Sequence, residues 1–226
     1  MLKTYRIPVI TLLSVLFVDQ FIKIYIKLHY AIGESAFRIG QWCDITFTEN
    51  PGMAFGMEFG GEYGKVILTV FRILACTGGF FYIRHIVRKN EPRLLIICVS
   101  LILAGAIGNI IDSVFYGVIF TESDEATVAQ LVAPGHGYSS FLHGSVVDML
   151  HFPLFDGTFP DWLPIWGGEH FQFFSPIFNF ADFSISVGVA ILILFQKHIQ
   201  KKPVETNLEN EPLTEGTPSV DNTSHV

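Results

Sequence analysis

The sequence predicts an all-α membrane protein with four transmembrane helices, and both its composition and its hydropathy pattern support this fold class. Of the 226 residues, 50% are hydrophobic and only 15% are charged, and the mean hydropathy is +0.45. Such values are typical of membrane proteins. A spanning helix needs about 20 mostly apolar residues. Four segments meet this requirement: residues 7–28, 64–83, 93–112 and 178–195.

The first apolar segment follows Lys3 and Arg6, as the apolar core of a secretory signal peptide would. It is longer than such a core, however, and no small-residue cleavage site follows it. We therefore expect the segment to be retained as a helix.

Basic residues indicate how the four segments are oriented. They cluster before the first segment, between the second and third, and after the fourth: Lys3, Arg6, Arg84, Arg88, Lys89, Arg93, Lys197, Lys201 and Lys202. In a four-span chain all three clusters lie on one side of the membrane, and the positive-inside rule assigns that side to the cytoplasm. We therefore expect both termini in the cytoplasm and the segments 30–63 and 113–177 outside it.

The segments outside the helices differ in character. Residues 37–59 contain strand-like pieces and turn signals, so we expect a small β-containing extracytoplasmic segment after the first helix. Residues 152–178 lie in an inserted extracytoplasmic loop before the fourth helix, and their many aromatic side chains suit a membrane interface. Residues 1–202 are then one membrane domain, and the polar residues 203–226 are expected to be a disordered cytoplasmic tail.

Charge and cysteine usage argue against several classes of function. The formal net charge is −7 and there is no basic patch with interleaved aromatic residues, so nucleic acid is not an expected partner. The odd number of cysteines, 3, does not suggest a disulfide framework. Histidines of the outer loop lack the tight spacing of metal ligands, so we expect no metal site; they are His136, His143, His151 and His170.

Polar side chains within the apolar segments share one depth. A charged side chain costs at least about 2.5 kcal/mol to insert at a helix centre, so each needs a reason. With the predicted topology, all of them lie toward the outer ends of their helices: Asp19 and Lys23 in the first, Asn109 and Asp112 in the third, and Asn179 and Asp182 in the fourth. Gly105 and Gly108 share the polar face of the third helix and allow close approach of a neighbouring backbone.

Four acidic residues are candidates for chemistry at this depth. Two carboxylates at one semi-buried site cannot both ionise cheaply, so such a pair shares a proton and can act as general base and general acid. Lys23 can neutralise Asp19, and Asp112 has Asn109 beside it and Arg72 as a possible partner. Asp148, in the apolar run 146–150, and Asp182 have no cation within several residues. These two are therefore the better candidates for a proton-sharing pair.

Five blocks, in this order, resemble the lipoprotein signal peptidase (signal peptidase II) family of bacterial membrane aspartic proteases. They are Asp19-Gln20-Phe21-Ile22-Lys23, Asn50-Pro51-Gly52-Met53-Ala54-Phe55-Gly56, Gly105-Ala106-Ile107-Gly108-Asn109-Ile110-Ile111-Asp112, Val146-Val147-Asp148-Met149 and Phe178-Asn179-Phe180-Ala181-Asp182. The resemblance extends over about residues 8–197, apart from an insertion.

The resemblance implies an activity and a site. In this family the catalytic aspartates lie in the fourth and fifth blocks, here Asp148 and Asp182, and no metal or cofactor is used. The family cleaves diacylglyceryl-modified prolipoproteins just before the lipid-bearing cysteine. The residues implied to bind substrate or shape the site are Asp19, Lys23, Asn50, Gly52, Gly108, Asn109, Asp112, Asn179 and Ala181.

The family also implies where the protein acts and with what. We expect a monomeric, multi-pass protein of the bacterial cytoplasmic (inner) membrane, with its active site facing the periplasm or cell exterior. Its expected partners are prolipoprotein substrates and membrane lipid. A site at the outer leaflet would let the diacylglycerol stay in the bilayer while the peptide bond reaches a water-bearing pocket.

The chain departs from the family pattern in two places. Ser113 stands where the family usually has Arg, and we hypothesise that Arg72 supplies the missing positive charge near Asp112. The link from Asp112 to Asp148 is also longer than usual, and the added residues 114–143 are interpreted as either a lid or a docking surface.

Two other classes of function remain as alternatives. A small proton-coupled carrier would also use intramembrane carboxylates, although the chain lacks paired halves or repeated broken helices. A non-catalytic lipid-binding membrane protein would not need two unpaired acids at one depth.

Overall fold

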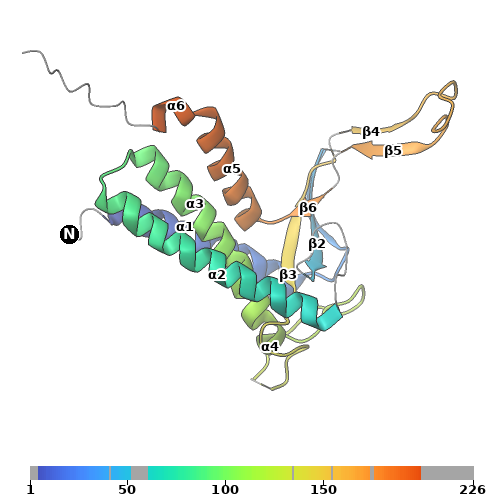
Figure 1. Ribbon diagram of the computed structural model, residues 1–226. Coiled ribbons are helices and arrows are strands. Elements are labelled where there is room, and N and C mark those ends of the chain that lie inside the picture. The colour runs from blue at the N-terminus through green and yellow to red at the C-terminus, as the bar shows by residue number, and fades with distance from the viewer. Residues whose placement is uncertain are drawn as a thin grey trace, which may run out of the picture.

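The computed structural model describes residues 5–40, 42–51, 61–133, 135–153, 155–173 and 176–199. The predicted disordered tail, 203–226, and the predicted site residue Gly52 lie outside these ranges. The main helices are α1 (Arg6–His29), α2 (Gly61–Arg88), α3 (Arg93–Ile111) and α5 (Phe180–Leu194), and a short α6 (Gln196–Ile199) follows α5. Figure 1 shows them packed together, with the strands gathered at one end.

Three stretches of helix are long and apolar enough to cross a membrane: Arg6–His29, Tyr63–Arg88 and Arg93–Ile119. The first three predicted segments are thus confirmed as long apolar helices and candidate spans, although the second continues to Arg88 and the third to Ile119, further than expected. The fourth predicted span corresponds to α5, which is apolar but has only 15 residues. The crossing of the membrane by this helix stays a prediction.

Helix α3 lies at the centre of the bundle and packs on α1, α2 and α5. Gly105 lies against the Ala181 carbonyl of α5, where a side chain would not fit. A methyl group at Gly108 would lie only 2.5 Å from Asp19 Oδ2 of α1. The predicted close approach at these two glycines is therefore confirmed, and it brings the polar ends of α1, α3 and α5 together.

The end of α3 departs from regular helix. Residues Asp112–Tyr116 form a π-helical turn, η2, which continues into the short α4 (Gly117–Ile119). Single π-helical turns inside α-helices are frequent at functional sites. Here the π turn begins at Asp112, one of the predicted site residues.

A four-stranded antiparallel sheet lies at this end of the bundle, in the order β1-β2-β3-β6. Its strands are β1 (Ser35–Ile39), β2 (Cys43–Asn50), β3 (Val146–His151) and β6 (Ile177–Phe178). The prediction of β structure only after the first helix was thus incomplete, because β3 and β6 come from the loop before α5. Both strands are short, and β3 is almost wholly buried, so it lacks the polar alternation that marks a half-exposed strand.

Strand β3 has two different faces. Val147 and Met149 are buried in an apolar cluster with Phe47 of β2 and with Tyr116 and Phe120. Because side chains alternate along a strand, Asp148 points the opposite way. Asp148 therefore points toward the helices, while the opposite face of β3 packs in the apolar cluster and holds the sheet in place.

The inserted segment supplies part of this apolar cluster. Tyr116, Phe120 and Ala129 are buried there, and Phe120 pairs with Leu131 across a small antiparallel bridge. The described part of the insertion therefore contributes to the apolar cluster under the sheet, while other side chains of it, such as Leu131 and Phe141, are exposed. The interpretation of the insertion as a lid or a docking surface stays a prediction.

A second ribbon, β4 (Phe155–Thr158) with β5 (His170–Phe173), projects away from the bundle (Figure 1). Its tip exposes Trp162, Ile165 and Trp166. The expected position of these side chains at a membrane interface stays a prediction.

Candidate active site

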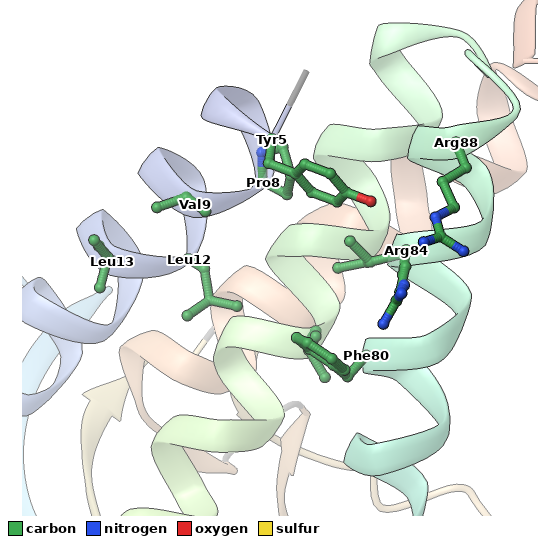
Figure 2. A pocket seen from close by; sticks show the side chains of 10 residues that line it. Tyr5, Pro8, Val9, Leu12, Leu13, Phe80, Arg84 and Arg88 are labelled. Carbon is green, nitrogen blue, oxygen red and sulfur yellow. The ribbon is translucent and has the colours of Figure 1, made fainter. Parts of the chain in front are cut away.

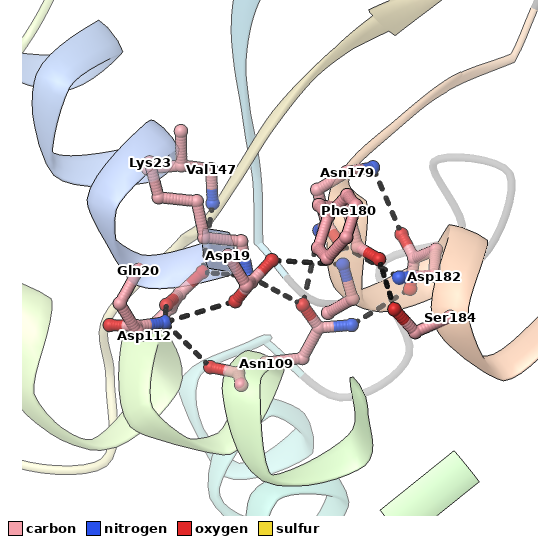
Figure 3. Close-up of polar contacts among 12 residues, drawn as sticks. Asp19, Gln20, Lys23, Asn109, Asp112, Val147, Asn179, Phe180, Asp182 and Ser184 are labelled. Carbon is pink, nitrogen blue, oxygen red and sulfur yellow. Dashed lines mark hydrogen bonds and ion pairs between the residues drawn. The ribbon is translucent and has the colours of Figure 1, made fainter. Parts of the chain in front are cut away.

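Polar side chains from α1, α3, β3 and α5 meet where the bundle joins the sheet (Figure 3). They include most of the residues that the sequence singled out, namely Asp19, Lys23, Asn109, Asp112, Asp148, Asn179 and Asp182, and Ala181 joins them through its backbone N–H. The predicted convergence of these residues is thus confirmed, while their common depth in a membrane stays a prediction.

Lys23 lies between two buried carboxylates. Its Nζ is 3.1 Å from Asp19 Oδ2 and 2.8 Å from Asp112 Oδ2, and all three side chains are fully buried. The backbone N–H of Ala181 donates to Asp19 Oδ1 at 2.9 Å, and that of Val147 to Asp112 Oδ2 at 3.3 Å. This network ties α1 to α3, to α5 and to the sheet.

Gln20 and Tyr116 complete this network, although sequence reasoning did not select them. Gln20 Nε2 donates to Asp112 Oδ1 at 2.9 Å, and Gln20 Oε1 accepts from the Tyr116 hydroxyl at 3.1 Å. The signal for Gln20 was its place inside the first family block. Tyr116 gave no comparable signal, because the π turn that positions it is not visible in the sequence.

Asn109 connects the buried ion network to Asp182. Its Oδ1 accepts from Lys23 Nζ at 2.8 Å. Because an ammonium group only donates, this contact fixes the orientation of the amide. Asn109 Nδ2 therefore points the other way and donates to Asp182 Oδ1 at 2.8 Å. The buried lysine thus sets the direction of a hydrogen bond to a predicted catalytic residue.

Asn179 and Asp182 form a capping box at the start of α5. Asn179 Oδ1 accepts from the Asp182 N–H at 2.9 Å, and Asp182 Oδ2 accepts from the Asn179 N–H at 3.4 Å. The remaining Asn179 amide group donates to Asp148 Oδ1 at 2.7 Å and to Asn109 Oδ1 at 3.0 Å. Two asparagines thus link the two aspartates, and the partly exposed Asp182 lies at a helix N-terminus, which favours negative charge.

Asp148 is 3% exposed and lies beside β2 in the sheet. Burial and the nearby charge of Asp182 raise the pKa of Asp148 to about 7, although hydrogen bonds from Asn179 and Asn50 oppose the rise. A carboxyl with such a pKa can hold a proton near neutral pH. The predicted site residue Asn50 therefore contacts Asp148 from the neighbouring strand.

Arg72 of α2 interacts electrostatically with Asp182 and Asp148. The hypothesis placed its charge beside Asp112, but Lys23 already occupies that position from α1. Arg72 therefore lies within electrostatic reach of the two predicted catalytic aspartates, and its compensation for Ser113 stays a hypothesis. Ser113, which stands at the family's usual arginine position, instead donates its hydroxyl to the Asn109 carbonyl at 3.0 Å.

Lys27 is a second buried lysine that the sequence analysis did not single out. It is fully buried, pairs with Glu49 of β2 and donates to Ser123 Oγ at 3.0 Å. Its ammonium also lies 5.0 Å from the ring centre of Tyr138 and 5.4 Å from that of Phe120. It thereby connects α1, β2 and the insertion. Its spacing of four from Lys23 placed it on the polar face, which was the available signal.

Within the described ranges, no group of three or more His, Cys, Asp or Glu side chains could hold a metal ion. What the site does offer is a carboxyl that can be protonated near neutral pH, Asp148, close to a carboxylate at a helix N-terminus, Asp182. Such a pair can pass protons to and from a bound water and a peptide bond.

Comparison with known proteins gives consistent results. The family model described as Signal peptidase (SPase) II matches residues 11–197. A lipoprotein signal peptidase of Porphyromonas gingivalis is 51% identical over 180 residues, which cover 79% of this chain and 77% of the relative. A lipoprotein signal peptidase of Amoebophilus asiaticus is 36% identical over 206 residues, covering 90% and 82%. A bacterial membrane enzyme solved by the in meso method has a TM-score of 0.51 at 25% identity, covering 84% of this chain and 91% of that one.

Proposed function

The chain belongs to the signal peptidase II family, and we propose that it acts as an aspartic endopeptidase with Asp148 and Asp182 as its catalytic pair. Its reaction is the removal of signal peptides from prolipoproteins. It is a multi-pass protein of the inner membrane. The observation that carries the catalytic assignment is the asparagine bridge between a buried, protonatable Asp148 and a helix-capping Asp182.

The environments of the two aspartates suggest different roles. Asp182 accepts N–H donors on both carboxylate oxygens and lies at the start of α5, so it is the member that carries the negative charge. Burial beside that charge leaves the shared proton on Asp148.

The reaction then follows from these two states. Asp182 takes a proton from a water as the water oxygen attacks the scissile carbonyl carbon, and Asp148 gives its proton to the carbonyl oxygen. In the second step the C–N bond breaks. The proton on Asp182 passes to the leaving nitrogen, while a hydroxyl of the tetrahedral intermediate returns a proton to Asp148, which restores the starting pair.

The other polar residues have supporting roles in this proposal. Lys23 holds Asn109 in the orientation that reaches Asp182, and Asn50 and Asn179 position Asp148. Arg72 adds positive charge near the two aspartates and stabilises the carboxylate that Asp148 becomes when its proton moves to the carbonyl oxygen. Loss of any of these residues should lower the rate while leaving the catalytic pair in place.

We further propose the four-span topology, with α5 as the fourth span and both termini in the cytoplasm. The basic clusters support this orientation, and it places the site toward the outer leaflet. A substrate held in the bilayer by a diacylglyceryl group would reach the site at that depth. The protein acts as a monomer in this scheme, since the residues of the site come from one chain.

The substrate requirement is the experimental test of this function. The purified full chain in detergent is given a synthetic prolipoprotein whose cysteine carries diacylglycerol, and the same peptide without the lipid. Mass spectrometry should find cleavage directly before the lipidated cysteine and at least about 100-fold slower cleavage of the unmodified peptide, because binding energy from the lipid is lost. Equal cleavage of both peptides, or cleavage elsewhere, would contradict the proposal.

A further inference from the structure

Residues of α1 and α2, with Leu103 of α3, line a partly open apolar pocket at the end of the bundle remote from the candidate active site (Figure 2). It lies near the beginning of α1 and the end of α2, whereas the site lies at the other ends of these helices. Its volume is about 610 Å³, and its walls include Leu12, Phe80 and Leu103. A cavity of this size and lining accepts an extended hydrocarbon chain.

The mouth of the pocket is basic. Arg84 and Arg88 line it, one turn apart on α2, and both are exposed. In Figure 2 their guanidinium groups and the hydroxyl of Tyr5 point into the same space. In the part of the chain that the structure describes, neither guanidinium has an ion pair with a carboxylate. The two guanidinium groups at the opening of the pocket would therefore attract the negatively charged group of a ligand.

Along α2, the two arginines lie nearer the end of the helix, and the apolar side chain of Phe80 lies further from that end. From Arg88 to Phe80 the helix rises about 12 Å at 1.5 Å per residue. Exposed apolar side chains of α1, such as Val9 and Leu13, continue the wall on the other side. A ligand that matches this order has an anionic head and a hydrocarbon tail.

We propose that this pocket binds an anionic phospholipid of the cytoplasmic leaflet, with its phosphate between Arg84 and Arg88 and one acyl chain against Leu12, Phe80 and Leu103. With the proposed topology, this end of the bundle faces the cytoplasm, where the anionic lipids of a membrane attract basic residues. The proposal is independent of the peptidase activity, since the pocket shares no residue with the catalytic site.

Charge also argues against a second occupant, the signal peptide of the substrate. A signal peptide begins with a positively charged segment before its apolar core. The two arginines at the mouth of the pocket would repel that segment at the depth where it lies. The same charges attract a phosphate group.

Native mass spectrometry of the full chain in detergent, mixed with dioleoyl phosphatidylglycerol or dioleoyl phosphatidylcholine, tests the proposal. The first bound phosphatidylglycerol should have a Kd about 30-fold lower than phosphatidylcholine, because each basic residue contributes about 1 kcal/mol and 1.4 kcal/mol is tenfold. The variant Arg84→Gln/Arg88→Gln should lose this preference. The charge-matched control Lys89→Gln/Arg93→Gln, at the same end but outside the pocket, should keep it.

A second variant separates the pocket from a general surface charge. Val9 is 51% exposed and lines the pocket, so Val9→Trp should fill the cavity without disturbing the buried core. It is expected to weaken binding of both lipids at least about tenfold, a loss of roughly 1.4 kcal/mol, with an unchanged melting temperature. Unchanged lipid binding by Val9→Trp, or equal loss of preference in the two charge variants, would overturn the proposal. So would a rise in KM for the prolipoprotein in Val9→Trp with normal lipid binding, since that outcome assigns the pocket to substrate.

Discussion

Replacing Lys23 with methionine removes the ammonium group between Asp19 and Asp112 while keeping a side chain of similar length. The lost contacts are the 3.1 Å and 2.8 Å ion pairs, both fully buried. Removing one partner of a buried ion network leaves uncompensated charge and costs about 3–5 kcal/mol. The structure therefore predicts a large loss of stability from one conservative change in shape.

The loss can be measured as a fall in melting temperature of the purified protein in detergent. For a chain of this length, 1 kcal/mol corresponds to roughly 2–4 °C, so Lys23→Met should lower the melting temperature by roughly 6–20 °C. Activity should fall as well, because Asn109 loses the donor that orients it toward Asp182. The exposed Lys197→Met serves as the control and should melt close to wild type.

A rescue variant identifies buried charge as the cause. Adding Asp19→Asn and Asp112→Asn to Lys23→Met replaces both stranded carboxylates by neutral amides of the same shape. Stability should recover by more than half, whereas activity should remain low. A fall of less than about 2 °C in Lys23→Met, under ~1 kcal/mol, would refute the buried-network reasoning.

Three further changes test other parts of the account. Asn50→Ala removes a hydrogen bond that favours the charged form of Asp148, so the pKa of Asp148 should rise above about 7. Because the reaction needs the proton on Asp148, cleavage should then persist to higher pH. An unchanged alkaline limb in the pH profile of kcat/KM would contradict the assignment of Asp148. Gly108→Ala places a methyl group 2.5 Å from a buried carboxylate oxygen of α1, so it should lower the stability by about 1–3 kcal/mol and remove most of the activity. Gly78→Ala is the control, because nothing lies within 4 Å of the added methyl group, and it should leave melting temperature and cleavage unchanged. Lys27→Met leaves the partly buried carboxylate of Glu49 without its ammonium partner, so it should lower the melting temperature and speed proteolysis of the insertion. Equal protection from protease in variant and wild type would contradict the link that Lys27 forms between α1, β2 and the insertion.

The helices and the common depth of the polar residues could be predicted because both depend on local pattern. Long apolar runs set the helix positions, and spacings of three and four placed residues such as Asn109 and Asp112 on one face. The topology then brought the outer ends of the helices together without any knowledge of the packing. The same reasoning selected Asp148 and Asp182 as the acids without a nearby cation.

Contacts between distant segments could not be predicted in this way. Strand β3 pairs with β2, which lies about 100 residues earlier in the chain. The local sequence determines neither the pairing partner of β3 nor the register of the pairing. The place of Arg72 depends on how α2 is rotated against α3, and the spacing along α2 alone cannot fix that rotation. The role of Lys27 likewise required the insertion, whose residues Phe120 and Tyr138 surround it, to be folded back on α1.

Cleavage of a diacylglyceryl-modified prolipoprotein by wild type, Asp148→Asn and Asp182→Asn tests the central claim most directly. Each protein is compared at equal concentration in detergent, after thermal unfolding has confirmed that it is folded. We expect cleavage before the lipidated cysteine by wild type and a loss of at least about 1000-fold, or ~4 kcal/mol of transition-state stabilisation, in both variants. Near-normal cleavage by either folded variant would contradict the proposed catalytic pair. A folded wild type that cleaves nothing would contradict the peptidase itself and favour the proton-coupled carrier.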